Sequence, residues 1–195
     1  MTARYVDHRL GEFLDMVARR QPTPGGGAVA AVTVSVAAGL VAMAARYSAD
    51  RMDGGDALVH DAERLRASAA DLADADAEAY GAVIAAYAGS DGDERLRRQL
   101  VGAALTRASE VALEVAELGA ETARLAGLLA VEGKRDVRGD AATALLLAEA
   151  ATRSASHLVV VNVEAGGGDG HLVRRAAETV ATAREAASAP ALRLA

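Results

Sequence analysis

The sequence predicts an all-α fold, a bundle of long helices. Alanine, the best helix former, supplies much of a hydrophobic content of 52%. Apolar residues recur at steps of three and four along the chain, and no stretch shows the strict alternation of a half-buried strand. A chain of 195 residues suits one compact helical domain, which we expect to span residues 1–195.

The stretch Pro22–Arg46, PTPGGGAVAAVTVSVAAGLVAMAAR, is expected to organise this fold. Its two prolines push the residues before them out of helical geometry. Three glycines follow and leave backbone N–H groups that no Cβ shields: Gly25, Gly26 and Gly27. The residues after them are small and apolar, without a charged side chain before Arg46. A helix that is apolar almost all round is expected at the centre of a bundle.

Two other interpretations of this stretch stay open. The uncharged run reaches the ~18 residues that a membrane span requires, although segments rich in alanine and glycine partition weakly into lipid. The glycines are also consistent with an ordinary helix entrance. Any helix N-terminus attracts anions to some degree, so a glycine-rich turn alone is a weak sign of a binding site. No Gly-Lys-Ser/Thr sequence follows the glycines, which argues against a P-loop.

Charge and composition exclude several classes of function. The net charge of −6 and the lack of a strong basic run argue against a nucleic-acid partner. The chain has no cysteine, which excludes disulfides, thiolate nucleophiles and cysteine-based zinc sites. The four histidines show no spacing typical of a metal site, so we expect no metal. The N-terminus carries acidic residues and does not resemble a secretory signal, which favours a cytoplasmic protein without a membrane partner.

The other helices follow from apolar spacing and from glycine-rich turns. A long helix in the second half contains Gly102 and Gly119, which mark either bends or a division into two helices. The expected helices, besides one from about Gly26 to Tyr47, are Asp7–Arg20, Ala57–Ala88, Glu94–Val131, Asp140–Glu164 and Gly170–Ser188.

Asp76 is the most informative single position. It follows Leu65, Ala69 and Leu72 at steps of three and four, which places it on the inward face of its helix. A carboxylate on a buried face costs several kcal/mol unless it is paired or protonated. A structural ion pair with an arginine of a neighbouring helix and a functional carboxylate are both consistent with this position.

A second polar pair lies on a helix of the C-terminal half. Asp140 stands before a run of alanine and leucine and is expected as a helix N-cap. The apolar face that begins there continues to Asn162, whose amide lies among valines and must find hydrogen-bond partners. This helix therefore carries a polar group at each end of one apolar face.

Four stretches in this order resemble the cyclodeaminase/cyclohydrolase family, the helical domain of formiminotransferase-cyclodeaminase and the stand-alone methenyltetrahydrofolate cyclohydrolases. PTPGGG before a small-residue helix resembles the opening of that family, and LADADAEAY resembles its "D-D-A-E-A-F/Y" segment. ALTRASEVALEVA resembles its helix around an "A-x-x-V-P-L" run. The stretch from Asp140 to Asn162 resembles its "S-D … A-x-L-A-E-A-A … I-N" helix.

This resemblance implies a homodimeric enzyme of folate one-carbon metabolism, with a tetrahydrofolate derivative as substrate and no tightly bound cofactor. It implies a folate between helices near the glycine loop and carboxylates in the roles of Asp76 and Asp140. In the cyclohydrolase reaction, water attacks the carbon that bridges N5 and N10. In the cyclodeaminase reaction, N10 closes on a formimino carbon and ammonia leaves. The sequence does not separate the two.

Both reactions need a group that moves a proton beside a cation, and a desolvated aspartate serves both needs. We expect one of the two aspartates as general base and the other as charge partner. The N–H groups of the three glycines and the Asn162 amide are expected to position the substrate. Arg46 and Arg138 are candidates for the glutamate tail.

The alternative is a dimeric helical protein that keeps the fold and binds another small molecule or a protein. It is favoured by departures from the family pattern at Ala28, Gly139 and Leu158.

Overall fold

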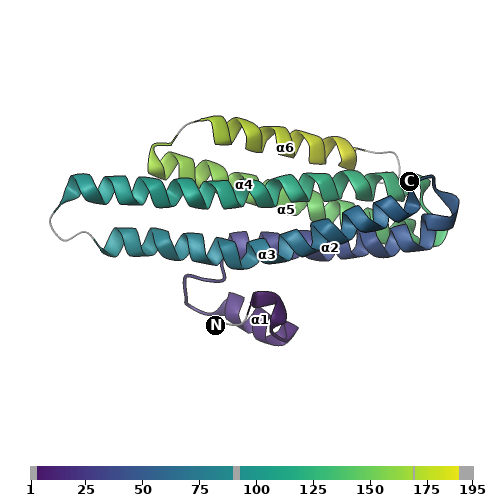
Figure 1. The fold of residues 1–195 in the computed structure, drawn as a ribbon, viewed down its shortest axis with the longest axis horizontal. Coiled ribbons are helices and arrows are strands. Elements are labelled where there is room, and N and C mark those ends of the chain that lie inside the picture. The colour runs from purple at the N-terminus through teal and green to yellow at the C-terminus, as the bar shows by residue number, and fades with distance from the viewer. Residues whose placement is uncertain (1–3, 90–92, 169, 189–195) are drawn as a thin grey trace.

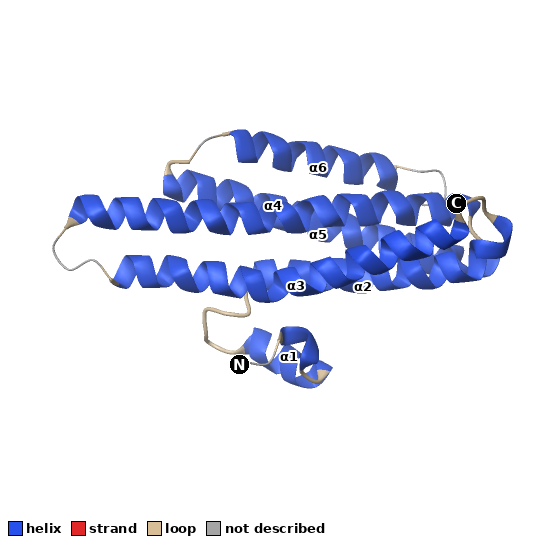
Figure 2. Ribbon diagram, viewed as in Figure 1, coloured by secondary structure: helices blue, strands red, loops and turns tan. Residues whose placement is uncertain are grey.

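The computed structural model describes residues 4–89, 93–168 and 170–188. Within these ranges the chain is helical and contains no strand (Figure 2). The elements are η1 (Tyr5–Asp7), α1 (Leu10–Ala18), α2 (Gly26–Ser48), η2 (Ala49–Arg51), α3 (Gly55–Ala88), α4 (Glu94–Glu132), η3 (Arg135–Val137), α5 (Arg138–Gly166) and α6 (His171–Ala187). The predicted all-α class is confirmed.

Four long helices, α2 to α5, form an elongated bundle (Figure 1). Each packs against the next in the chain or across the bundle, and α4 and α5 share the most extensive contact. The last helix, α6, lies along α4 and α5. The short α1 sits apart from the bundle, and Figure 1 shows it separated from the long helices by the loop that leads into α2.

Small side chains permit close helix packing in the core. Alanines fill much of the interface between α2, α4 and α5, together with Val41, Leu129 and Leu145. The predicted long helix is not divided at its glycines, since α4 is one uninterrupted helix. A Cβ at Gly119 would overlap with the hydroxyl of Thr152 on α5, so this glycine permits the close approach of the two helices.

One face of α2 stays exposed in the single chain. Val36 and Tyr47 are 55% and 60% exposed, and they belong to an apolar stripe at helical spacing. The other members are half-buried: Val29, Val32, Leu40 and Met43. The expectation that α2 lies at the centre of the fold is therefore not confirmed by one chain, because α2 lies at the side of the bundle between α3 and α5.

Among the described residues, two stretches are long and apolar enough to span a membrane by length and composition alone, Gly26–Arg51 and Arg135–Gly166. About half of each apolar window is buried inside the bundle, 56% and 44% respectively. The core helix of a soluble protein passes the same test, so this observation is weak evidence for a membrane span.

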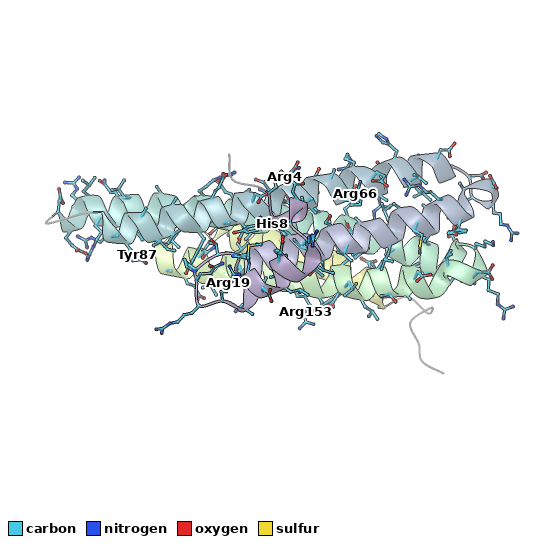
Figure 3. The ribbon with its side chains drawn as sticks, turned by 90° about the horizontal axis from the view of Figure 1, so that it is seen from below. Arg4, His8, Arg19, Arg66, Tyr87 and Arg153 are labelled. Carbon is cyan, nitrogen blue, oxygen red and sulfur yellow. The ribbon has the colours of Figure 1, made fainter. Side chains whose placement is uncertain are left out.

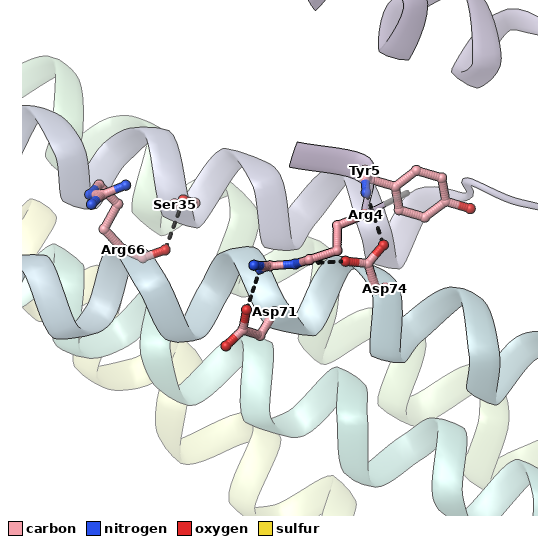
Figure 4. A network of polar contacts seen from close by, with 6 residues as sticks. All are labelled: Arg4, Tyr5, Ser35, Arg66, Asp71 and Asp74. Carbon is pink, nitrogen blue, oxygen red and sulfur yellow. Dashed lines mark hydrogen bonds and ion pairs between the residues drawn. The ribbon is translucent and has the colours of Figure 1, made fainter. Parts of the chain in front are cut away.

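The N-terminal segment is fixed to α3 by a polar cluster (Figure 4). Arg4 forms ion pairs with Asp71 and with Asp74, and the backbone N–H of Tyr5 donates to Asp74 Oδ1 at 3.0 Å. The Tyr5 ring meets Phe13 of α1 edge to face at 6.0 Å. These contacts hold α1, and the loop that follows it, near the N-terminal end of α2.

Two aspartates near helix N-termini differ in role. Asp93 caps α4, since its Oδ1 accepts from the backbone N–H groups of Arg95 and Leu96 at 3.0 Å. Asp140 is not an N-cap: α5 begins two residues earlier, at Arg138, so Asp140 lies within the first turn. There a negative charge still stabilises the helix dipole.

Candidate functional site

A cavity of about 250 Å³ opens at the N-terminal end of α2. The loop before α2 supplies one wall, and α3, α4 and α5 supply the others. Its lining residues are Pro22, Thr23, Gly25, Gly26, Gly27, Asp76, Tyr80, Ala108, Leu158 and Asn162. The structure therefore brings the three glycines, Asp76 and Asn162 of the sequence analysis together in one pocket.

The glycine loop and Asp76 are fitted to each other. A Cβ at Gly27 would overlap with Oδ1 and Cγ of Asp76, so the carboxyl group occupies the space that a side chain at position 27 would need. The first N–H groups of a helix lack partners within the helix. One of them, the N–H of Ala28, donates to the Asp76 carboxylate. Asp76 thus acts as a partner for the N-terminus of α2 from the neighbouring α3.

The environment of Asp76 favours its protonated form. Burial raises the pKa of this carboxyl group above its ordinary value, and the hydrogen bond from Ala28 opposes that shift only in part. The structural ion pair considered for this position is not found: among the described residues, no arginine or lysine forms a salt bridge with Asp76. A buried carboxyl group with a raised pKa, in a cavity and without a cation, is typical of a functional site.

Asn162 and Leu158 enter the cavity from α5, one helical turn apart. Asn162 also lines a neighbouring cavity with Ser109 and Glu110 of α4. Tyr80 was not predicted as a site residue, because the spacing of Tyr80 on α3 is that of an apolar core position. Its position one turn after Asp76 was the available signal.

Three predicted site residues do not lie in this pocket within one chain. Asp140 is 22 residues before Asn162 on the same helix, a separation of about 33 Å at 1.5 Å per residue. Arg46 lies near the far end of α2, where it pairs with Glu63 at 2.7 Å. Arg138 donates from Nε to the carbonyl oxygen of Gly133 at 2.9 Å. The prediction that both aspartates and the glycine loop line one pocket is wrong for a single chain, because α5 runs the length of the bundle between them.

Comparison with known proteins now identifies the chain. The family model described as Formiminotransferase-cyclodeaminase matches residues 9–182. This chain belongs to that family. A methenyltetrahydrofolate cyclohydrolase of Methylorubrum extorquens is 32% identical over 161 residues, which cover 78% of this chain and 77% of that protein. The resemblance noted in the sequence is thereby confirmed.

A solved structure extends the comparison to the fold. The crystal structure of formiminotetrahydrofolate cyclodeaminase from Thermotoga maritima matches with a TM-score of 0.77 and 28% sequence identity. The match covers 92% of this chain and 90% of the other. The relatives thus carry the names of two different folate reactions on one fold.

Proposed function

We propose that this protein is a folate one-carbon enzyme and that it hydrolyses the methenyl bridge of methenyltetrahydrofolate. The observation that carries the proposal is the largely buried Asp76 carboxyl group at the glycine loop, which lies in a cavity and has no salt-bridge partner among the described residues. The cyclohydrolase name of the Methylorubrum relative supports the choice of reaction.

In this proposal, Asp76 acts as general base. Its carboxylate takes a proton from water as the water oxygen bonds to the bridging carbon, which is cationic in the substrate. The adduct then opens as the bond from carbon to N5 breaks: the hydroxyl group of the adduct loses its proton to become the formyl oxygen, N5 takes up a proton, and the formyl group stays on N10. The net result is addition of one water and release of one proton. A carboxylate beside the pocket also stabilises the bound cation.

A second reaction class uses the same groups. The structural neighbour from Thermotoga maritima is a cyclodeaminase, whose reaction closes N10 on a formimino carbon with loss of ammonia. There Asp76 would give a proton to the leaving nitrogen, and a raised pKa suits a proton donor as well as an acceptor.

Assays with both substrates decide between the reactions. With purified protein, the decay of the methenyl chromophore measures hydrolysis, and ammonia release from formiminotetrahydrofolate measures deamination. We expect the first rate to exceed the buffer rate clearly and the second to stay at background. The reverse pattern would replace the proposal by the cyclodeaminase reaction. Folate binding without either turnover would favour the binding-protein alternative.

We also propose that the protein is a homodimer through the exposed stripe on α2. The stripe is uncharged and apolar, and an exposed apolar face of this length is typical of an interface. Val36→Arg should convert the dimer to a monomer in analytical ultracentrifugation. Ala103→Arg, at an exposed position of α4 across the bundle, should leave the dimer intact. A monomeric wild type would refute this assembly.

An antiparallel pairing of two α2 stripes gives the remaining predicted residues a role. A two-fold axis near the middle of α2 would place the far end of one chain, with Asp140, Arg46 and Arg138, beside the pocket of the other. In this arrangement Asp140 acts as charge partner across the interface, and the two arginines are candidates for the glutamate tail.

Subunit mixing tests this arrangement. We expect Asp140→Asn to lower turnover, and a mixture of Asp76→Asn and Asp140→Asn subunits to recover about a quarter of wild-type activity, since random pairing leaves one intact site in half of the dimers. A fully active Asp140→Asn variant, or a mixture as inactive as its components, would exclude Asp140 from the site and leave Asp76 unaffected.

A further inference from the structure

Tyr80 is the aromatic residue of the pocket. It is the one aromatic side chain among the ten residues that line the cavity, in a chain with only four tyrosines and one phenylalanine. The residue is 44% exposed, although it lies beside the buried core residues Ala79 and Val83 on α3. A large apolar ring with this exposure at a cavity wall is available to contact a ligand.

Helix geometry places the ring beside the reactive group. Residues four apart lie on the same face of a helix, so Tyr80 follows Asp76 by one turn along the wall that α3 contributes. Other parts of the wall have small side chains or none: three glycines of the loop, and Ala108 of α4. Leu158 of α5 supplies a second apolar contact. The cavity thus combines one aromatic side chain with walls in which several residues have small side chains or none.

The size of the cavity limits what it holds. At about 250 Å³ it is smaller than the ~300–1,000 Å³ typical of pockets that enclose a whole drug-sized ligand. A flat bicyclic head group with its substituents directed outward matches this volume better than an entire folate does. An aromatic ring at the wall then provides stacking, which is tolerant of ring substituents.

We propose that Tyr80 is a positioning residue that stacks on the planar ring of the substrate and holds the reacting carbon against Asp76. This inference rests on the proposed function, and it adds the residue that recognises the pterin-like head group. The ring of Tyr80 carries the interaction, and its hydroxyl group is not required.

Binding measurements with matched variants test the proposal. The probe is 5-formyltetrahydrofolate, a stable folate, in isothermal titration calorimetry with the full chain. We expect Tyr80→Leu to weaken binding roughly 10-fold, within the range that loss of a stacking aromatic costs for nucleobases. Tyr80→Phe should bind within about 2-fold of wild type, because the stacking face is retained.

Tyr87→Leu is the matched control. Tyr87 lies on the same helix, is also exposed, does not line the cavity and sits toward the end of α3 (Figure 3). This variant should bind as wild type does. Equal affinities of the leucine variants at positions 80 and 87 would overturn the proposal, as would a Tyr80→Phe variant as weak as Tyr80→Leu.

Steady-state kinetics separate positioning from structural damage and from failure of the proposed function. Tyr80→Leu should raise KM roughly 10-fold and change kcat less than about 3-fold, with an unchanged thermal midpoint. A lowered midpoint with equal losses in kcat would show a structural role and overturn the proposal. If wild type binds the folate and turns over neither substrate, the proposed reaction fails and the binding comparison still decides the role of Tyr80. A wild type that binds no folate overturns both.

Discussion

The two ends of α2 lie beside aspartates in different environments. At the glycine-loop end, Asp76 is largely buried, accepts a hydrogen bond from Ala28 and faces a cavity. At the other end, Asp140 is exposed and Arg46 is paired with Glu63. Asp140 is therefore compensated by solvent, whereas the compensation found for Asp76 among the described residues is one backbone hydrogen bond.

This difference shows which charges are available for chemistry. Exposed ion pairs contribute about 0–1 kcal/mol. A buried carboxyl group without a cation destabilises the folded state in its ionised form. In the proposed function, a cationic substrate supplies the charge that stabilises the ionised carboxyl group. The glycine-loop end is accordingly where substitutions should have the largest effects.

The largest expected effect is that of Asp76→Asn on turnover. The amide keeps the size of the side chain and still accepts from Ala28, but it cannot take a proton, so we expect kcat to fall at least about 100-fold. Asp136→Asn, which removes an exposed partner of Lys134 at the other end, should stay within about 2-fold of wild type. Equal activities of the two variants would show that the carboxyl group of Asp76 is no more important for turnover than an exposed one.

Gly27→Ala should have the next largest effect. A Cβ at this position overlaps with the Asp76 carboxyl group and must displace it, and a misplacement of about 1 Å in a site costs up to about 100-fold in rate. We expect a loss of turnover of roughly 10- to 100-fold. Gly81→Ala on α3 is the control, because a Cβ there meets no atom within 4 Å. Full activity of Gly27→Ala would show that the carboxyl position is not critical.

A smaller effect, of opposite sign, is expected on stability. Burial raises the pKa of Asp76 in the folded chain above its unfolded value. The folded chain then holds a proton that the unfolded chain has lost, so this group lowers stability as the pH rises through the folded-state pKa. Asp76→Asn should therefore unfold at a higher denaturant concentration than wild type at neutral pH. The difference should shrink as the pH is lowered, and a variant less stable at every pH would contradict it.

The smallest effect should come from the polar cluster at the N-terminal segment. Arg4 is about half exposed, so Arg4→Gln should lower the free energy of unfolding by less than about 1 kcal/mol. For a chain of this length that corresponds to a shift of at most about 2–4 °C in the thermal midpoint. Arg97→Gln, which removes an exposed pair within α4, is the comparison. A much larger loss for Arg4→Gln would show that the segment holds the whole glycine-loop end together.

The fold was largely predictable because its signals are local. Helical spacing, alanine content and glycine-rich turns give the bounds of α2 to α6 within a few residues, and the step pattern alone identified Asp76 as inward-facing. The glycine loop was recognisable for the same reason. Local sequence patterns show which residues share a helix face, but they do not show which of those residues share a pocket in the folded bundle. Within one chain Asp140 and Asn162 lie at opposite ends of α5, so the single pocket predicted for them is not formed by one chain alone.

Tyr80 was missed because a tyrosine at this spacing is found both in a core and at a cavity wall. Tyr80 has the spacing of a core residue, and only the three-dimensional arrangement shows that it lines a cavity. Gly119 illustrates the same limit, since a helical glycine indicates either a bend or a close helix contact. The position of Thr152 on α5 shows that Gly119 makes a close helix contact.

Direct titration of Asp76 is the sharpest test of the account. In aspartate labelled with ¹³C at the carboxyl carbon, Asp76 is identified by the signal that Asp76→Asn removes, and its pKa is compared with the acid limb of kcat/KM. We predict a pKa above the ordinary aspartate value, with the rate falling as the pH drops through that same pKa. A carboxyl group that titrates at or below its ordinary value, or a rate that does not follow it, would contradict the central role of Asp76.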